Sequence, residues 1–451
     1  MIAASVTAAS RPILWNIPLG LVVYMYAGMV VALAIATWGV WRRVRIWRLG
    51  KPEVRTDHWP QRLQRVTVDA LLQRVVVRAR APGLAHAALW SGFVVLFGAT
   101  LVVMAQMDLG LPVLRGRLYL WFVSLAGNVF GLLALLGVAF ALVRRYLVRP
   151  PGLERREPAD ALVLVALLLL LASGFVLSGL RIAATHDAWQ GWRPVASATA
   201  SLLAAWLPAD ALAPLHRYTW LGHVTLWYVI LAALPYTKLL HMGTVPLAIY
   251  FGNLRPGPEL PAIDFEDETA LETLGVKTAL ELTWKQLLDL DACTECGRCE
   301  RVCPPHATGS SLSPKRVILG IRDRVRADAA ALRAARAAQT RGQPDAAALR
   351  EALPALPDVV GQDALWACTT CRACEATCPA GIEHVRLILQ LRQNLAMEQA
   401  LLPEGLAQLP RQLELRDHPF CGVPVDRHAW FVEAVAAEAG AVVAHGEEVS
   451  R

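Results

Sequence analysis

Eight cysteines fall in two runs whose spacing is typical of iron–sulfur cluster ligands. Each run reads C-x2-C-x2-C-x3-C-P, within CTECGRCERVCPP and CTTCRACEATCPA. In proteins with two cubane [4Fe–4S] clusters, three closely spaced thiolates hold one cluster and the fourth, before proline, ligates the other. We therefore expect two cubanes with crossed ligands. The first set is Cys293, Cys296, Cys299 and Cys378, and the second set is Cys368, Cys371, Cys374 and Cys303.

Paired C-x2-C motifs also bind zinc, which takes four ligands as two pairs. Each run here has a third thiolate and a fourth before proline, which disfavours zinc. A cubane with four thiolates has no open position for substrate, so this part of the chain is expected to conduct electrons, with no catalytic residue of its own. The ninth cysteine, Cys421, is either a free thiol or a ligand to a group in a partner.

Histidines in apolar segments suggest a second redox group. Ionisable residues inside a bilayer are costly and mark functional sites. His86 begins one apolar segment, and His241 closes another; each alone is also compatible with a plain interfacial role. His223 lies 18 residues before His241, about 27 Å along a helix. We expect a b-type haem between His86 and His241, near the cysteine domain.

The roles of His223 and Lys238 stay open. His223 is a cofactor-binding candidate, either for a second haem with His186 or His216, or as part of a quinone pocket. Lys238 lies one turn before His241, where its ammonium could balance a haem propionate or a quinone oxygen. The alternative for Lys238 is that its side chain snorkels to the interface.

The composition indicates a membrane protein. Hydrophobic residues make up 55% of the 451 residues and charged residues only 18%, against about 25% charged in ordinary globular proteins. The net charge of +7 comes from basic clusters beside apolar stretches, which favours a membrane over nucleic acid. A spanning helix needs about 20 apolar residues. Five spans are expected, at about 18–40, 84–107, 118–143, 161–180 and 219–240.

Basic residues follow the first and third expected spans, and the positive-inside rule places such connections in the cytoplasm. The N-terminus is then outside, and everything after about residue 242 is cytoplasmic. The first span reads as a retained anchor, because no basic segment precedes it and a basic cluster follows it. Residues 61–80 mix arginine with leucine and valine at helical spacing, which suggests an interfacial helix.

The predicted fold class is all-α. A five-helix transmembrane domain of the b-type cytochrome kind (1–250) precedes a linker (251–291), a mostly helical dicluster ferredoxin-like domain (292–434) and a mobile tail (435–451). Within the dicluster domain, Ser313 and Pro314 indicate the start of a helix reaching about residue 338. Another helix is expected at about 382–399.

Several stretches resemble a known family. They are YTKLLHMGTVPLAIYFGNL, LTWKQLLDLDACTECGRCERVCPP, TGSSLSPK, LWACTTCRACEATCPAGIEHV and HPFCGVPVDRHAW. The chain resembles membrane-bound iron–sulfur proteins related to heterodisulfide reductase, and most of all the electron-transfer-flavoprotein:menaquinone oxidoreductases. Its membrane half is similar to the gamma subunit of respiratory nitrate reductase, a five-helix b-type cytochrome that exchanges electrons with quinone.

Two departures from that family bear on the expectations. The nitrate reductase type has two histidines on its second span, whereas only His86 is present here, so the resemblance implies one haem more firmly than two. Fuller family members continue into cysteine-rich CCG modules, and this chain ends about 20 residues after HAWF. We expect a separate polypeptide to supply such a module.

The resemblance implies a quinone-linked oxidoreductase subunit in a bacterial or archaeal cytoplasmic membrane. Electrons from a cytoplasmic flavoprotein, such as electron-transfer flavoprotein, or from a CCG-module partner would pass through the two clusters and haem to menaquinone or another quinone. One alternative reverses the flow, so that quinol is oxidised and a disulfide- or sulfur-reducing partner is fed. Another makes the chain a passive membrane anchor and docking platform.

Overall fold

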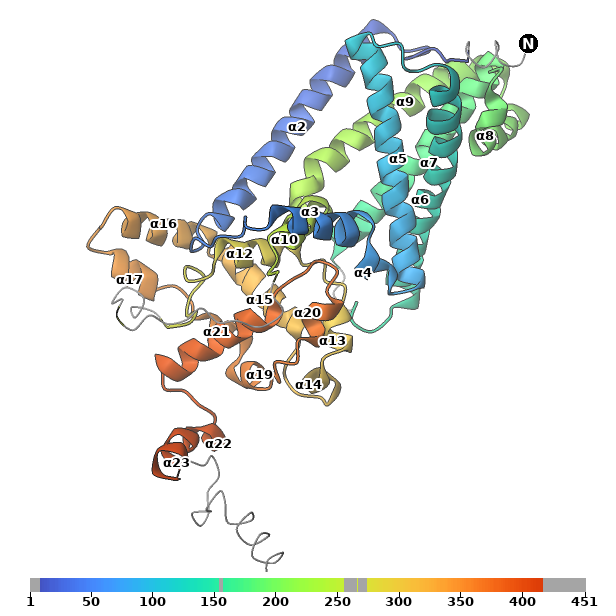
Figure 1. Cartoon of the computed structure of the whole chain (residues 1–451). Coiled ribbons are helices and arrows are strands. Elements are labelled where there is room, and N and C mark those ends of the chain that lie inside the picture. The colour runs from blue at the N-terminus through green and yellow to red at the C-terminus, as the bar shows by residue number, and fades with distance from the viewer. Residues whose placement is uncertain (1–8, 154–156, 255–265, 267–273, 417–451) are drawn as a thin grey trace, which may run out of the picture. The chain divides into compact units, whose positions relative to one another are not determined.

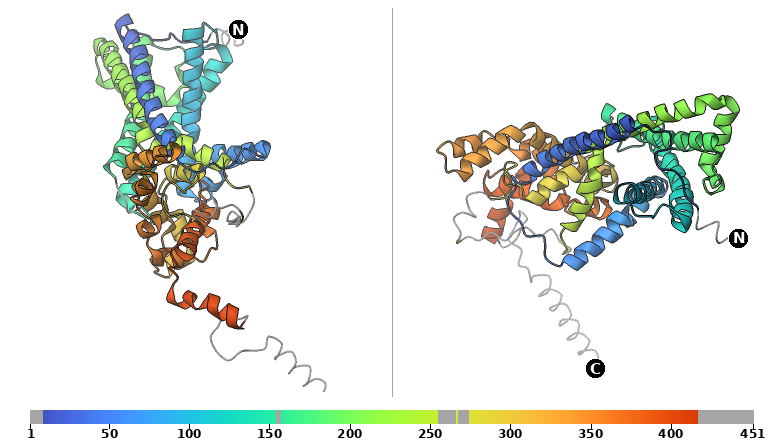
Figure 2. Two further views of the ribbon diagram at one scale, coloured as in Figure 1. Left: turned by 90° about the vertical axis from the view of Figure 1, so that its left-hand side faces the viewer. Right: turned by 90° about the horizontal axis from the view of Figure 1, so that it is seen from above.

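The computed structural model describes residues 9–153, 157–254, 266 and 274–416. These residues form helices and connecting loops, with two isolated β-bridges and no strand among them. The expected all-α class is confirmed (Figure 1). The long apolar helices stand together as one bundle, and the short helices of the cysteine-containing half lie at one end of it (Figure 2).

Among the described residues, four helices are long and apolar enough to cross a membrane, and a bent pair of helices raises the number to five if it counts as one span. Within the bundle α5 packs on α6, and α9 packs on both α2 and α7. Each span exceeds the length of about 20 residues that a bilayer requires. The first four are α2 (Leu19–Trp47), α5 (Ala81–Leu109), the continuous run Leu118–Val148 (η2 Leu118–Ala126, α6 Gly127–Leu142, η3 Val143–Val148) and α7 (Pro158–Thr185).

The fifth span is bent by 78° between Ala209–Tyr236 and Lys238–Tyr250. Proline at 235 removes a backbone donor, and Thr237 is extended and accepts a hydrogen bond from Leu239 N at 3.4 Å. His241 therefore begins a new helix, and the straight helix assumed in the 27 Å estimate does not continue to it. The segments are α9 (Ala209–Ala233), η5 (Leu234–Tyr236), η6 (Lys238–Leu240) and α10 (His241–Tyr250).

The connection between the first two spans is helical but broken. The single helix expected at 61–80 is replaced by α3 (Trp59–Arg65), η1 (Val66–Leu71) and α4 (Arg74–Val77). The break falls at Gln73, whose φ of 55° is left-handed. Arg62 donates to the carbonyls of Tyr250 and Gly252, at 2.9 and 2.8 Å, which pins this connection to the end of α10.

The cysteine-containing half is built from short helices. Ser313 caps α15 by accepting a hydrogen bond from Arg316 N at 3.0 Å, as expected, but the helix breaks at Asp328 before α16 begins. α12 lies inside the stretch expected to be a linker. The helices of this half are α12 (Trp284–Ala292), α13 (Arg298–Arg301), α14 (Pro304–Ala307), α15 (Pro314–Ala327), α16 (Ala329–Thr340), α17 (Ala346–Glu351), α18 (Leu356–Val360), α19 (Gln362–Trp366), α20 (Ala373–Thr377) and α21 (His384–Met397).

Two further short elements belong to the connection between α7 and α9, namely η4 (Gln190–Trp192) and α8 (Pro194–Trp206). Residues from Leu395 onward form a separate compact unit, which contains α22 (Glu404–Ala407) and α23 (Leu409–Arg416). Cys421 and the expected tail at 435–451 lie outside the described residues.

Candidate cluster and histidine sites

The two cysteine runs have matching backbone conformations. The third residue of each run, Glu295 or Thr370, has φ of 59° or 56°, and the fifth, Gly297 or Arg372, has φ of 71° or 63°. Left-handed residues are uncommon outside glycine and persist where the surrounding structure holds them. The repeated conformation therefore wraps each run into the same compact loop.

The fold brings the fourth cysteine of each run to the other run. Cys378 lies within electrostatic reach of Cys293, Cys296 and Cys299. Likewise, Cys303 lies within reach of Cys368 and Cys371, and of Cys374. The thiols thus gather into two mixed sets, which we call the first nest (Cys293, Cys296, Cys299, Cys378) and the second nest (Cys368, Cys371, Cys374, Cys303).

The chemistry of these thiols fits a bound metal cluster. Burial raises the pKa of Cys293 to about 11 and of Cys374 and Cys378 to about 12, and neighbouring thiols add to the shift at Cys378. Cluster ligands are thiolates, so binding must supply the positive charge that favours deprotonation. Among the described residues, no three His, Cys, Asp or Glu side chains converge on a single metal ion. A cubane takes one thiolate per iron and does not require such convergence.

The second nest surrounds a small cavity. All four of its cysteines line this cavity, with Pro305, Leu312, Pro314, Val385 and Ile388 forming much of the remaining wall. A dry apolar wall around thiolates is one of the means by which a protein sets a cluster potential. Cys371 is exposed, whereas the described cysteines of the first nest are partly buried. Cys303 and Cys374 are buried, so the second nest is open to solvent at Cys371.

The first nest faces the membrane helices. Arg298 donates to the carbonyls of Val75 and Val76 at 2.9 and 3.0 Å. Gly297 approaches the turn after the third span so closely that a Cβ there would lie 2.6 Å from the carbonyl oxygen of Gly152. Only glycine fits this backbone contact, which joins the first nest to the end of the bundle.

His86 and His241 come together across the bundle. Their ring centroids are 6.2 Å apart, and the ring planes differ by 60°. Metal–imidazole nitrogen bonds are about 2 Å long, which places two rings on opposite sides of one metal at centroid distances of about 6 Å. His241 Nδ1 donates to Lys238 O at 2.5 Å, and His86 Nδ1 lies 3.2 Å from Gln73 Oε1. Hydrogen bonds at Nδ1 leave both Nε2 atoms available as ligands.

His223 lies elsewhere and pairs differently. Its Nδ1 lies 2.9 Å from Ser173 Oγ on α7. No second histidine ring contacts it within the part of the chain that the structure describes. His216 packs edge-on against Trp15, with ring centroids 4.8 Å apart, and His186 ends α7 in a left-handed conformation. The structure therefore does not bring His223 to either histidine considered as its partner.

Lys238 connects the membrane helices with the first nest. Its Nζ donates to Asp160 Oδ2 at 2.7 Å and to Glu295 Oε2 at 3.0 Å. Arg145 also contacts Asp160, and Arg322 donates to Glu295 at 2.7 Å. The ammonium is bound to two carboxylates, and its role toward a haem propionate or a quinone oxygen stays a prediction. Glu295 stands between Cys293 and Cys296, where its position in the run is the one signal that could have identified it.

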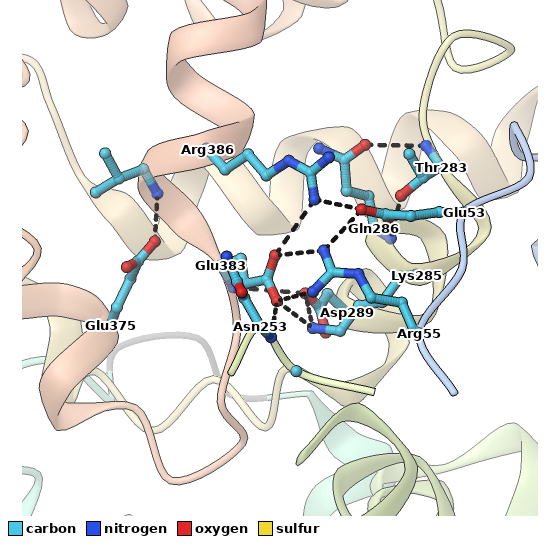
Figure 3. Close-up of polar contacts among 12 residues, drawn as sticks. Glu53, Arg55, Asn253, Thr283, Lys285, Gln286, Asp289, Glu375, Glu383 and Arg386 are labelled. Carbon is cyan, nitrogen blue, oxygen red and sulfur yellow. Dashed lines mark hydrogen bonds and ion pairs between the residues drawn. The ribbon is translucent and has the colours of Figure 1, made fainter. Parts of the chain in front are cut away.

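A second charged cluster holds the first nest together (Figure 3). Lys285 on α12 contacts Asp289 at 2.7 Å and Glu383 at 3.4 Å. Arg55 donates to both oxygens of Glu383 at 3.0 and 3.2 Å. Sequence analysis missed these residues, because only the i,i+4 spacing of Lys285 and Asp289 is visible in the sequence. The network consists of Glu53, Arg55, Lys285, Asp289, Glu383 and Arg386.

Family models match both halves of the chain. The 4Fe-4S dicluster domain matches residues 289–382, which contain all eight cysteines of the two runs. The nitrate reductase gamma subunit matches residues 84–254, which contain His86, His223 and His241. No solved structure matches the chain. The matches establish an iron–sulfur domain joined to a membrane domain of the nitrate reductase gamma kind.

Relatives extend over most of the sequence. EtfAB:quinone oxidoreductase of Syntrophomonas wolfei is 33% identical over 412 residues, covering 87% of this chain and 57% of that protein. The probable iron-sulfur-binding oxidoreductase FadF of Bacillus subtilis is 30% identical over 444 residues, covering 94% and 62%. One of the dihydromethanophenazine:CoB–CoM heterodisulfide reductase subunits of Methanosarcina acetivorans is 30% identical over 153 residues, covering 33% and 34%.

The expected resemblance is therefore confirmed. The chain is homologous to iron–sulfur oxidoreductases of these kinds and to heterodisulfide reductase subunits. It spans about three fifths of the length of the first two relatives.

Proposed function

We propose that this membrane iron–sulfur protein passes electrons from a cytoplasmic flavoprotein or CCG-module partner to menaquinone. The observation that carries the proposal is the order of the sites. The second nest is open to solvent at Cys371, and the first nest contacts α4, which precedes the helix of His86, and Lys238, three residues before His241. A partner would dock beside the second nest, and the membrane end of the path would be at the histidine pair.

The residues fit two cubanes and one b-type haem. The first and second nests would hold the clusters, and His86 and His241 would hold the haem iron. Each of these groups, when bound, carries one electron at a time, whereas menaquinone takes up two electrons and two protons to become menaquinol. The chain's own residues set ligand position, burial and hydrogen bonding, which determine the potentials.

The orientation in the membrane follows from the basic connections. Arginines 42, 43, 45 and 48 after the first span, and arginines 144, 145 and 149 after the third, favour the cytoplasmic side under the positive-inside rule. The cysteine-containing half lies at that end of the bundle, because Trp47 at the end of α2 donates to Asp291 beside the first run at 2.9 Å. The nests would then face cytoplasmic partners.

A visible difference spectrum tests the membrane half of this proposal. The purified, air-oxidised chain is mixed with a menaquinol analogue, and a b-type α-band and Soret change is expected. His241→Ala should abolish the change, whereas His223→Ala, the matched control on the same span, should retain it. A spectrum without any haem signal, or unaltered haem in His241→Ala, would refute the assigned haem. Equal loss in both variants would indicate two interdependent haems.

Electron paramagnetic resonance tests the cluster half. Cys299→Ser should remove one reduced-cluster signal and stop turnover with quinone, because Cys299 belongs to the first nest. Two intact cluster signals with unchanged turnover would contradict the proposed path. Quinone-dependent oxidation of the reduced clusters, or their reduction by a quinol, in the unaltered chain would exclude a purely passive anchor.

The relation to a heterodisulfide reductase component favours one second candidate, in which quinol is oxidised and electrons leave through the second nest. The order of the groups is the same in both directions. Isolation of the complex from native membranes distinguishes them. A co-purifying electron-transfer flavoprotein or acyl-CoA dehydrogenase would favour menaquinone reduction, and a disulfide- or sulfur-reducing enzyme would favour the reverse.

A further inference from the structure

Three arginines meet at the end of the bundle away from the cysteine nests. Arg11 precedes α2, Arg181 lies in the last turns of α7, and Arg193 is the residue before α8. Arg181 follows Asp160, at the nest end of the same helix, by 21 residues, which is about 30 Å at 1.5 Å per residue. The arginine cluster (Arg11, Arg181, Arg193) therefore lies across the membrane from the nests.

The cluster carries more positive than negative charge. Arg181 donates to Asp187 at 2.8 Å, and Asp187 also accepts a hydrogen bond from Trp189 N at 2.9 Å. Arg193 is bonded to neutral groups, donating to Ser124 Oγ at 3.1 Å and to the Tyr119 hydroxyl at 3.3 Å.

Arg11 lies within electrostatic reach of the other two arginines, of Tyr119 and of Asp187. Among the described residues around it, three guanidinium groups face one carboxylate.

Burial makes this excess charge costly. Arg181 and Arg193 are each 4% exposed. The Nε atoms of Arg11 and Arg181 are buried and have no hydrogen-bond partner within the described part of the chain. Burial, together with repulsion from Arg193 and Arg181, lowers the pKa of Arg11 to about 9. Unpaired buried charges are strongly destabilising, so such groups are normally found with a counter-charge.

A purely structural role accounts for part of the cluster only. Arg193 ties the third span to α7 and α8 through Ser124, Ser178 and Tyr119, over whose ring the guanidinium also lies. Neutral donors would serve those hydroxyl groups equally well. The contacts leave the two excess charges unexplained.

We infer that Arg11, Arg181 and Arg193 form a binding site for the phosphate groups of an anionic phospholipid. Guanidinium groups bind phosphate through paired hydrogen bonds. The cluster lies at the ends of spans, where headgroups are found, and Trp189 and Trp192 pack beside Tyr119, as is typical of interfacial aromatic residues. Arg11 is the least buried of the three arginines, so the site reaches the surface there.

The charge of the cluster specifies the lipid. A zwitterionic headgroup brings its own cation and leaves the excess of two positive charges unchanged. Phosphatidylglycerol balances one of them, and cardiolipin, with two phosphates, balances both. The expected order of binding is therefore cardiolipin, then phosphatidylglycerol, then phosphatidylcholine. This inference is independent of the proposed electron path.

Lipid-dependent thermal stability tests the site. The full chain is purified and delipidated in a non-ionic detergent, and its melting temperature is measured with added cardiolipin or phosphatidylcholine. A ligand that binds the folded state raises the melting temperature. Cardiolipin is expected to stabilise the chain and to be retained in native mass spectra. Arg11→Gln should weaken binding by about fivefold, corresponding to about 1 kcal/mol for one basic contact.

Matched variants keep the test decisive. Arg193→Lys keeps the charge but loses the paired hydrogen bonds and should retain part of the cardiolipin binding, whereas Arg193→Gln should lose it. Arg117→Gln removes an exposed arginine near the same end and should behave as the unaltered chain. Equal stabilisation by both lipids, or Gln variants that bind cardiolipin as tightly as the unaltered chain, would overturn the inference. Loss of haem from Arg193→Gln with unchanged lipid binding would also overturn it and would assign the cluster to a haem propionate.

Discussion

Replacing Lys285 by methionine is expected to loosen the first nest. Lys285 lies on α12, which ends directly before Cys293, and its partner Glu383 lies five residues after Cys378. The ammonium thereby holds together the two chain segments that supply the crossed ligands. Its side chain is 1% exposed and lies 2.7 and 2.8 Å from the oxygens of Asp289. Methionine fills a similar volume but leaves the carboxylates without this charge.

The structure allows the size of the effect to be worked out. Two unit charges about 3 Å apart interact by about 5–6 kcal/mol at an effective dielectric of 20. Removing one partner of a buried pair costs about 3–5 kcal/mol in practice. Because 1 kcal/mol moves the melting temperature by about 2–4 °C in a domain of about 150–250 residues, a fall of about 10 °C is expected.

Differential scanning fluorimetry measures the fall, with two matched comparisons. Lys277→Met removes the same type of side chain from a pair with Glu351, whose side chain is 76% exposed. Exposed pairs contribute at most about 1 kcal/mol, so this variant should melt close to the unaltered chain. Adding Asp289→Asn to Lys285→Met removes the stranded carboxylate and should restore part of the loss. Equal melting of the two single lysine variants, or no rescue by the double variant, would refute the reasoning.

The loss should also depend on pH. Burial raises the pKa of Asp289, Lys285 opposes this shift, and Glu383 adds to it. Without Lys285 the pKa rises further. An acid whose pKa is raised in the folded state loses stability as the pH rises through that value. The deficit of Lys285→Met is therefore expected to be larger at about pH 9 than at about pH 6.

Three further predictions concern the nests themselves. Cys378→Ala should remove the cluster signal of the first nest and Cys303→Ala that of the second, and the opposite pattern in electron paramagnetic resonance would exclude crossed ligands. Gly297→Ala should lower the melting temperature, because the added Cβ would meet the carbonyl oxygen of Gly152. Arg372→Ala, at the equivalent left-handed position, should leave the melting temperature unchanged. Similar falls in melting temperature for the two variants would argue against the contact with Gly152. In the cluster-free chain, Cys371 should react first with a maleimide, since it is exposed; peptide mapping that finds a buried cysteine first would contradict this.

Much of the fold was readable from the sequence because its signals are local. Apolar length gave the spans, and Ser313 followed by Pro314 gave the start of α15. The expected membrane topology alone placed His86 and His241 at the same depth in the membrane. In the structure their ring centroids are 6.2 Å apart. Haem ligation by the pair stays a prediction. The bend after Tyr236 was not readable, since it depends on the conformation of Thr237 as well as on Pro235.

Long-range charge pairing was not readable from local patterns. Arg55 and Glu383 are 328 residues apart, and Lys238 and Glu295 are 57 apart. Hydrophobic periodicity identifies which face of a helix is buried, but it does not identify which of 44 basic residues meets which of 37 acidic ones. Those partners are chosen by the tertiary structure, and they are the residues that hold the nests in place.

The two nests share a backbone design but differ in charged residues at several equivalent positions, and the third position of each run is one of them. Glu295 in the first loop is replaced by Thr370 in the second. The carboxylate binds Lys238 and Arg322, and the carbonyl of Lys238 accepts the hydrogen bond from His241 Nδ1. Net charge and hydrogen bonding near a cluster set its potential. One lysine thus contacts both the first loop and the histidine pair, so a change at either site alters the electrostatic surroundings of the other.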